Sequence, residues 1–212
     1  MSIYLHRTGL ESRPSFTLAP PLPFIEKFDW ASNTSAPLST RLEWNDTDTR
    51  RQLLVRDFGE HAGTLAHAAI AAEVCEALYA GSDLTSDHYM QIDLTNFDRR
   101  AVIRLRYNKN EKDYECYQFR IDRSLSIWTF QRRSSGNWTT LADGSAALPS
   151  SCTFRAEALG TSLRMFINDN QIGETVSDNV LSHGNMASFI LIASKPTISN
   201  TCVSRVEIGQ LA

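Results

Sequence analysis

The sequence predicts an all-β fold: an antiparallel β-sandwich preceded by an extended N-terminal arm. Apolar and polar residues alternate with a period of two over most of the chain, as in strands that bury one face. Short clusters of Gly, Asn, Asp and Ser separate these segments at the spacing of a meander. The chain shows neither the strand–helix alternation of a parallel sheet nor an internal repeat of fixed period.

The segment Cys152–Asn170 shows this pattern most clearly. Its apolar residues alternate with polar ones on either side of a turn at Gly160-Thr161, and they are Phe154, Ala156, Ala158, Leu163, Met165 and Ile167. A second turn follows at Asn168-Asp169-Asn170, where asparagine tolerates the left-handed backbone conformation. The segment is therefore predicted to be a hairpin that leads into a further strand.

The same alternation predicts strands along the rest of the chain. They are Phe24–Trp30, Arg41–Asn45, Gln52–Asp57, Tyr89–Thr95, Ala101–Tyr107, Tyr114–Asp122, Leu125–Arg132, Trp138–Asp143, Gln171–Val176, Ala187–Ala193 and Cys202–Ile208. The stretch His61–Tyr79 is ambiguous, because its Ala, Leu and Glu content favours a helix from Thr64 to Tyr79. Its residues also alternate, and strands lie on both flanks, so we favour strand.

Residues 1–23 differ in composition from the rest. Pro14, Pro20, Pro21 and Pro23 oppose both helix and sheet. Because the segment is also more apolar than a solvated linker, we expect an arm that lies across its own domain or docks on a neighbouring subunit. This gives two parts, the arm at 1–23 and a sandwich domain at 24–212.

Composition excludes several classes. With 42% apolar residues, 21% charged residues and a net charge of −3, the chain is predicted to be globular and not a polybasic nucleic-acid binder. No apolar run is long enough for a membrane helix, and no export signal is recognisable at the N-terminus, so we expect a cytoplasmic start. The four cysteines are widely spaced, which favours buried free thiols over a zinc site or a disulfide framework.

The order of these elements resembles the concanavalin A-like lectin/glucanase superfamily, in its laminin-G-like form. The resemblance lies in Ser86-Asp87-His88-Tyr89-Met90, in the strands with Arg104 and Tyr114, and in the closing pattern Gly160-Thr161-Ser162-Leu163, Phe166–Asn170 and Leu181–Gly184. It implies a jelly roll of two curved antiparallel sheets. Members bind glycans, serve as interaction modules, or cleave polysaccharides.

Candidate binding residues come from the charge distribution. Residues 99–133 carry a net charge of +6, which leaves −9 for the remainder. If Ile103, Leu105, Tyr107, Tyr117, Phe119 and Ile121 point into the core, period-two geometry places Arg104, Arg106, Gln118 and Arg120 on the opposite face. Guanidinium groups suit carboxylate, sulfate or phosphate, so an acidic glycan is one expected ligand. Trp128 is either a core residue or an apolar platform for a sugar ring, and a solvated outer face is the alternative for the arginines.

Catalytic signatures are absent from the sequence. We find no paired-carboxylate ExDxxE motif of retaining glucanases, nucleophile elbow, HExxH, P-loop or GxGxxG. No metal site is predicted, although calcium could bind loop oxygens of Asn168, Asp169, Asp178 and Asn179.

The expected function is therefore a non-enzymatic recognition or assembly module. A glycan-binding fold without an export signal suits a phage virion protein released by lysis, such as a capsid decoration or tail adhesion subunit. Its expected partners are a glycan and, through the N-terminal arm, other virion subunits or copies of itself, with neither nucleic acid nor membrane insertion. The alternatives are a glycan-degrading enzyme, either a glycoside hydrolase or a polysaccharide lyase, and a purely structural sandwich.

Overall fold

The structure is a computed structural model of the 212-residue chain. It describes residues 23–26, 36–37, 44–46, 53–56, 64–67, 75–79, 84–109, 114–184, 186–192 and 201–211. These residues form strands and connecting loops, and no helix able to cross a membrane occurs among them. The predicted arm lies outside this part of the chain except for Pro23.

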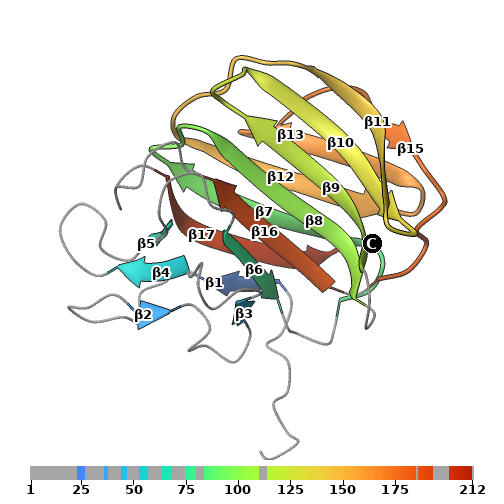
Figure 1. Cartoon of the computed structure of the whole chain (residues 1–212), viewed down its shortest axis with the longest axis horizontal. Helices are drawn as coiled ribbons and strands as arrows, with labels where there is room; N and C mark the ends of the chain where they lie inside the picture. The colour runs from blue at the N-terminus through green and yellow to red at the C-terminus, as the bar shows by residue number, and fades with distance from the viewer. Residues whose placement is uncertain are drawn as a thin grey trace, which may run out of the picture.

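The described strands form two antiparallel sheets stacked face to face (Figure 1). The ten-stranded sheet has the order β14-β13-β12-β7-β17-β5-β4-β2, with β1 paired to β17 and β15 to β13. Its strands are β1 (Phe24–Glu26), β2 (Ala36–Pro37), β4 (Leu53–Arg56), β5 (Thr64–His67), β7 (His88–Thr95), β12 (Cys152–Leu159), β13 (Ser162–Ile167), β14 (Asn170–Gln171), β15 (Val176–Ser177) and β17 (Cys202–Gln210).

The seven-stranded sheet has the order β11-β10-β9-β8-β16-β6-β3. Its strands are β3 (Trp44–Asp46), β6 (Cys75–Tyr79), β8 (Arg100–Lys109), β9 (Tyr114–Asp122), β10 (Ile127–Ser134), β11 (Asn137–Ser145) and β16 (Met186–Ile192). All pairings in both sheets are antiparallel, so the predicted sandwich is confirmed.

The ambiguous stretch contains two strands among its described residues, β5 and β6, and the helix alternative is wrong for them. β5 pairs with β4 and β17, and β6 pairs with β16 and β3. Sheet pairing on both sides overrides the local helix propensity of this segment.

One hydrophobic core fills the space between the sheets. It contains the predicted inward residues of the hairpin, such as Phe154 and Met165, together with Tyr117, Phe119 and Ile121 from the opposite sheet. Cys116, Cys152 and Cys202 are buried cysteines, as predicted, and burial raises the pKa of Cys116 to about 12. Such thiols act as small apolar residues.

Two hairpin turns of the sandwich have positive φ angles at both of their central residues. In the hairpin between β13 and β14, Asn168 and Asp169 both have positive φ, at 49° and 61°. Ser135 and Gly136 do the same between β10 and β11, at 51° and 77°. Positive φ at both central residues is the turn geometry that matches strand twist.

Candidate functional site: the outer face of the seven-stranded sheet

A continuous row of hydrogen-bonded polar side chains crosses the outer face of the seven-stranded sheet. It begins on β6, where Glu76 Oε1 accepts hydrogen bonds from Ser188 Oγ of β16 at 2.6 Å and from Arg104 of β8 at 2.8 Å. Burial opposes the charge of Arg104, but the facing Glu76 carboxylate outweighs it and raises the pKa of the guanidinium. This end of the row is therefore an ion pair shielded from water.

The row continues through the amides of two glutamines. Arg104 Nε donates to Gln118 Oε1 at 3.2 Å, and Gln118 Nε2 donates to Gln131 Oε1 at 3.0 Å. Gln131 Nε2 then reaches Thr140 Oγ1 on β11 at 3.4 Å. These contacts follow the strand register, because Arg104 lies opposite Gln118, Gln118 opposite Gln131, and Gln131 opposite Thr140. We call this set the polar row: Glu76, Ser188, Arg104, Gln118, Gln131 and Thr140.

Exposure increases along the polar row from β16 to β11. Ser188 is 0% exposed and Arg104 8%, Gln118 and Gln131 are half-buried, and Thr140 is exposed. A ligand can therefore approach the row at its β10–β11 end.

Aromatic rings stand beside that open end. Tyr107 and Tyr114 are stacked with centroids 5.2 Å apart, and Trp138 meets Tyr114 edge-on at 6.4 Å. Trp138 is 39% exposed. We call Tyr107, Tyr114 and Trp138 the aromatic cluster, and burial raises the pKa of the Tyr107 hydroxyl to about 12.

Two arginines pack on the aromatic cluster. The guanidinium carbon of Arg133 lies 4.1 Å from the Tyr114 ring centroid and 5.6 Å from that of Trp138. Arg104 lies 4.9 Å and 5.9 Å from the same two rings. Cation–π contact holds these side chains in place. Because Arg104 of the polar row contacts the aromatic cluster, the row and the cluster form one surface.

The structure brings three of the five predicted binding residues to this face. Arg104 and Gln118 are members of the polar row. Arg120 lies on the same face, where its NH2 group and Arg100 Nε both bind Asp122 Oδ2, at 3.3 Å and 3.0 Å. Arg120 is thus paired with Asp122 two residues along its own strand, β9, whereas Arg100 pairs with the same carboxylate across the strands from β8.

The prediction that Arg106 shares this face is wrong. A β-bulge shifts the register of β8 and β9 between Leu105 and Asn108, and Arg106 has a φ of 49°. The bulge turns Arg106 inward, where it is 2% exposed, and it turns Tyr107 outward, against the predicted core position. Period-two geometry fails at this point because the bulge adds a residue.

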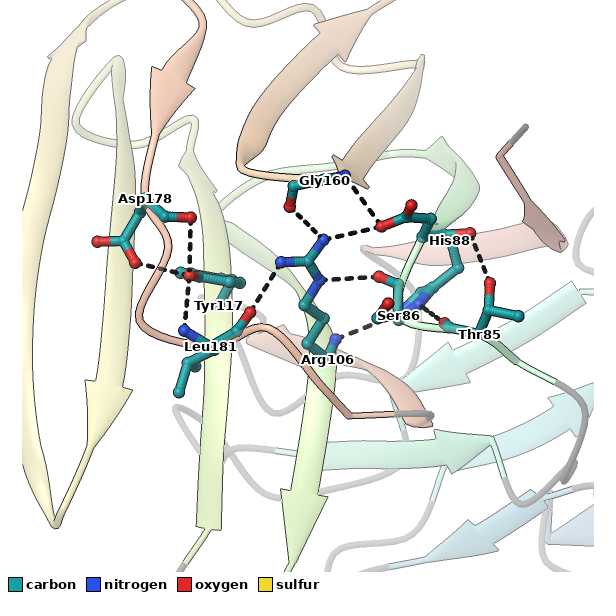
Figure 2. Close-up of polar contacts among 9 residues, drawn as sticks. Thr85, Ser86, His88, Arg106, Tyr117, Gly160, Asp178 and Leu181 are labelled. Carbon is teal, nitrogen blue, oxygen red and sulfur yellow. Dashed lines mark hydrogen bonds and ion pairs between the residues drawn. The ribbon is translucent and has the colours of Figure 1, made fainter.

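Arg106 ties three loops together at the rim of the sandwich (Figure 2). Its guanidinium donates to the carbonyl oxygens of Ser86, Leu181 and Gly160 at 2.6–2.8 Å and to Asp87 Oδ1 at 3.0 Å. The backbone N–H of Arg106 donates to Nε2 of the buried His88 at 3.2 Å. These bonds give Arg106 a structural role.

Trp128 is a core residue, 8% exposed, and does not offer a face to a sugar ring. Its indole packs against Phe130 and against two glycines. A Cβ atom on Gly144 or Gly173 would lie 2.6 Å or 2.5 Å from the Trp128 ring. Glycine at both positions is therefore needed for the ring to fit.

Eight residues of this surface were not predicted as binding residues from the sequence: Glu76, Ser188, Gln131, Thr140, Tyr107, Tyr114, Trp138 and Arg133. Extending the period-two argument to the strand Leu125–Arg132 would have placed Gln131 beside Gln118. Glu76 had no such signal, because it lies in the stretch where helix and strand were both open.

The proposed calcium ligands are largely engaged in other contacts. Asp178 accepts hydrogen bonds from Tyr117 and from the Val180 backbone and pairs with Arg132. Asn168 accepts one from the Thr153 backbone. No cluster of three or more His, Cys, Asp or Glu suited to a metal occurs within the described ranges.

Comparison with known proteins identifies the fold. No family model and no curated protein matches the chain. Among solved structures, a β-glucanase from Bacillus licheniformis matches with a TM-score of 0.61 at 7% identity, covering 89% of this chain and 98% of its own. A galectin-like protein of unknown function from Bacillus subtilis matches with a TM-score of 0.59 at 11% identity, covering 88% and 94%.

The carbohydrate-binding module CBM66 from Bacillus subtilis is also similar, with a TM-score of 0.54 at 16% identity and coverage of 77% of this chain and 94% of its own. The chain has a concanavalin A-like jelly-roll fold. Identities this low show the fold alone.

Proposed function

We propose that this jelly roll is a non-enzymatic glycan-binding module whose site is the surface formed by the polar row and the aromatic cluster. The observation that supports this most is the exposed Trp138 ring beside the open end of the polar row. A sugar offers an apolar ring face and a set of hydroxyl groups. An aromatic ring next to fixed hydrogen-bonding groups complements both.

The contacts of Asp122 and Glu76 on this face support binding over hydrolysis. Glycoside hydrolysis needs one carboxyl group that keeps its proton near neutral pH. Burial opposes ionisation of Asp122, but hydrogen bonds from Ser124 and Arg100 and the charges of Arg100 and Arg120 outweigh it and lower its pKa. Glu76 is held in an ion pair with Arg104. Both groups are therefore placed as hydrogen-bond acceptors.

The test is a glycan array probed with the full chain and with two matched variants. Trp138→Ala removes the aromatic ring at the proposed site. Phe166→Ala is the control, because Phe166 lies on the outer face of the ten-stranded sheet under Arg155, with the guanidinium carbon 4.5 Å from the ring centroid.

We expect Trp138→Ala to weaken binding about tenfold or more, equivalent to ~1.4 kcal/mol, and Phe166→Ala to leave it unchanged. The reverse result would place the site on the other sheet. No binding to any glycan by the full chain would favour a purely structural sandwich.

Bound glycans should also be incubated with the protein and assayed for reducing ends and unsaturated products. We expect none. Turnover that disappears when a single carboxylate is replaced would make the protein an enzyme.

Glycan binding should survive chelation of metal ions. Loss of glycan binding in EDTA, with recovery when calcium is added, would show a metal requirement.

We further propose that the module acts on a virion, as a laminin-G-like decoration or adhesion subunit that assembles with particle subunits or with copies of itself through the arm. The apolar, proline-rich composition of residues 1–23 supports docking, although this segment lies outside the described residues. The test compares particle association and oligomer size for the full chain and for a chain lacking residues 1–23. Normal assembly without the arm would contradict this role.

A further inference from the structure

A polar cleft at the rim of the sandwich is separate from the polar row. Two pockets of about 290 Å³ and 390 Å³ adjoin there and share Ser86 and Ser182 in their linings. We call their combined space the rim cleft. Its described lining is Ser86, Asp87, Arg106, Asn108, Gly160, Thr161, Asn179, Ser182, His183 and Gly184. The volume is in the range of small-molecule sites.

The walls of the rim cleft are fixed in place by Arg106 (Figure 2). Its bonds to Ser86, Gly160 and Leu181 join the three loops that enclose the cleft. On the far side, Tyr117 Oη donates to Asp178 at 2.6 Å and accepts from the Leu181 backbone at 3.1 Å. A cleft whose walls are already ordered loses little conformational entropy when a ligand binds.

Several described residues that line this cleft have hydrogen-bonding side chains without a partner in the protein. Among the described residues, the side chains of Ser86, Asn108, Asn179 and Ser182 form no hydrogen bond with the protein. Asp87 uses only Oδ1, which accepts from Arg106 and from the Gly160 backbone, and its side chain is 37% exposed. Its Oδ2 is left to accept a hydrogen bond from a ligand.

The chemistry of the lining excludes other ligand classes. The one guanidinium in the described lining, Arg106, donates from Nε and both terminal nitrogens to protein oxygens, so it is not available to a phosphate or sulfate. The described lining contains no Phe, Tyr, Trp or large aliphatic side chain for an apolar ligand, and its one ring is the polar imidazole of His183. Hydroxyl, amide and carboxylate groups together suit a neutral ligand rich in hydroxyl groups.

Residues of the rim cleft are neighbours in sequence of residues in or against the aromatic cluster. Asn108 of the cleft follows Tyr107 of the cluster, and Met186, which packs against Tyr107, follows Gly184 of the cleft by two residues. We propose that the rim cleft is a second sugar site, which binds one neutral sugar unit through Asp87, Asn179 and the serine hydroxyls. The choice of a sugar as the ligand class rests on the glycan binding proposed above, whereas the location of this second site does not.

The test is an NMR titration of the ¹⁵N-labelled full chain with glucose, galactose, mannose, N-acetylglucosamine and fructose. We expect at least one sugar to shift the backbone amides of Gly160 and Asn179 and the side-chain amide of Asn108 in a saturable way at millimolar concentration. The amide of Gly144, beneath Trp128, should not move. If none of the five sugars shifts the cleft amides, the proposal is wrong.

Three variants make the result specific. Ser182→Phe fills the cleft from an exposed position and should abolish the shifts, and Asn179→Ala should weaken them at least tenfold. Thr175→Phe, also at an exposed position but outside the lining, should preserve them. Shifts that persist in Ser182→Phe would overturn the proposal.

Trp138→Ala separates this proposal from the proposed function. Cleft shifts retained in Trp138→Ala would show that the two sites are independent. If the array binding depends on Trp138 while no sugar reaches the cleft, the proposed function stands and the second site does not.

Discussion

Arg106 and Arg104 are two residues apart in sequence, yet their guanidinium groups lie in opposite environments. The side chain of Arg104 belongs to an outer face, whereas that of Arg106 is buried among loop carbonyls. The alternation of polar and apolar residues predicts the first position correctly. It cannot predict the second, because a bulge is set by long-range contacts such as the bond from Arg106 N–H to His88.

Replacing Arg106 by lysine should strongly destabilise the protein. Lysine keeps the charge but cannot donate simultaneously to Ser86, Gly160, Leu181 and Asp87, so buried carbonyls lose their partners. We expect the free energy of unfolding to fall by about 3 kcal/mol, measured by urea denaturation. Arg120→Lys should cost less than about 1 kcal/mol, because the Arg120 side chain is partly exposed and Arg100 still pairs with Asp122. Equal effects would contradict the role of Arg106.

His88 should make stability depend on pH. Its Nδ1–H donates to the Thr85 carbonyl at 2.6 Å and its Nε2 accepts from Arg106, so the folded state requires the neutral ring. Burial lowers the pKa of His88 from 6.5 to about 4, with a further contribution from the Arg106 charge. Between these values the unfolded chain binds a proton that the folded chain does not.

The free energy of unfolding should therefore be level above about pH 6.5 and decrease as the pH falls toward 4, with a total loss of about 3 kcal/mol. Denaturation curves at several pH values measure this. His88→Gln can keep both hydrogen bonds without titrating, so its stability should vary less over the same interval. An identical pH dependence in the variant would assign the effect to other groups.

At the scale of single elements, most strands from β7 onward follow their predicted ranges closely. The prediction of one strand over Gln171–Val176 is wrong, because only its ends are strand, in β14 and β15, and each pairs separately with β13. β9 occupies the predicted Tyr114–Asp122, and β12 and β13 form the predicted hairpin. Strands buried on one face carry their own alternation, so local sequence is enough to find them. The row from Glu76 to Thr140 depends instead on which strands are neighbours. That order places β16 between β6 and β8 and is not encoded locally.

The turn between β13 and β14 provides a test at this scale. Asn168 has a positive φ and accepts a hydrogen bond from the Thr153 backbone at 2.9 Å. Asn168→Ala loses that bond and places alanine in the left-handed region, so we expect a loss of about 1–2 kcal/mol. Asn170→Ala, one step beyond the turn, is the control and should cost less. Thermal unfolding of both variants measures the difference, and equal losses would contradict the role of this turn.

For the whole molecule, one core cluster joins the two sheets. Trp128 and Phe130 from the seven-stranded sheet belong to the same cluster as Phe154 and Ile92 from the ten-stranded sheet. Neither sheet can lose its packing without exposing the apolar face of the other. We therefore expect a single cooperative unfolding transition.

Tryptophan fluorescence and far-UV circular dichroism should give the same unfolding midpoint in urea. The first reports on the four tryptophans, of which Trp128 lies in the core cluster, and the second reports on both sheets together. Two separated midpoints would show that the sheets unfold independently.

From Arg104 to Thr140, the hydrogen bonds of the polar row all run from donor to acceptor in the same direction, which Arg104 imposes. A guanidinium can only donate, so Gln118 must present its carbonyl oxygen to Arg104 and its NH2 to Gln131, which repeats the arrangement toward Thr140. Each bond polarises the next in the same sense. Thr140 Oγ1 is therefore an acceptor within the row and keeps its hydroxyl proton for solvent or a ligand. The exposed end of the row acts as a proton donor, and a ligand oxygen without a hydrogen of its own, such as a ring or glycosidic oxygen, is the natural complement.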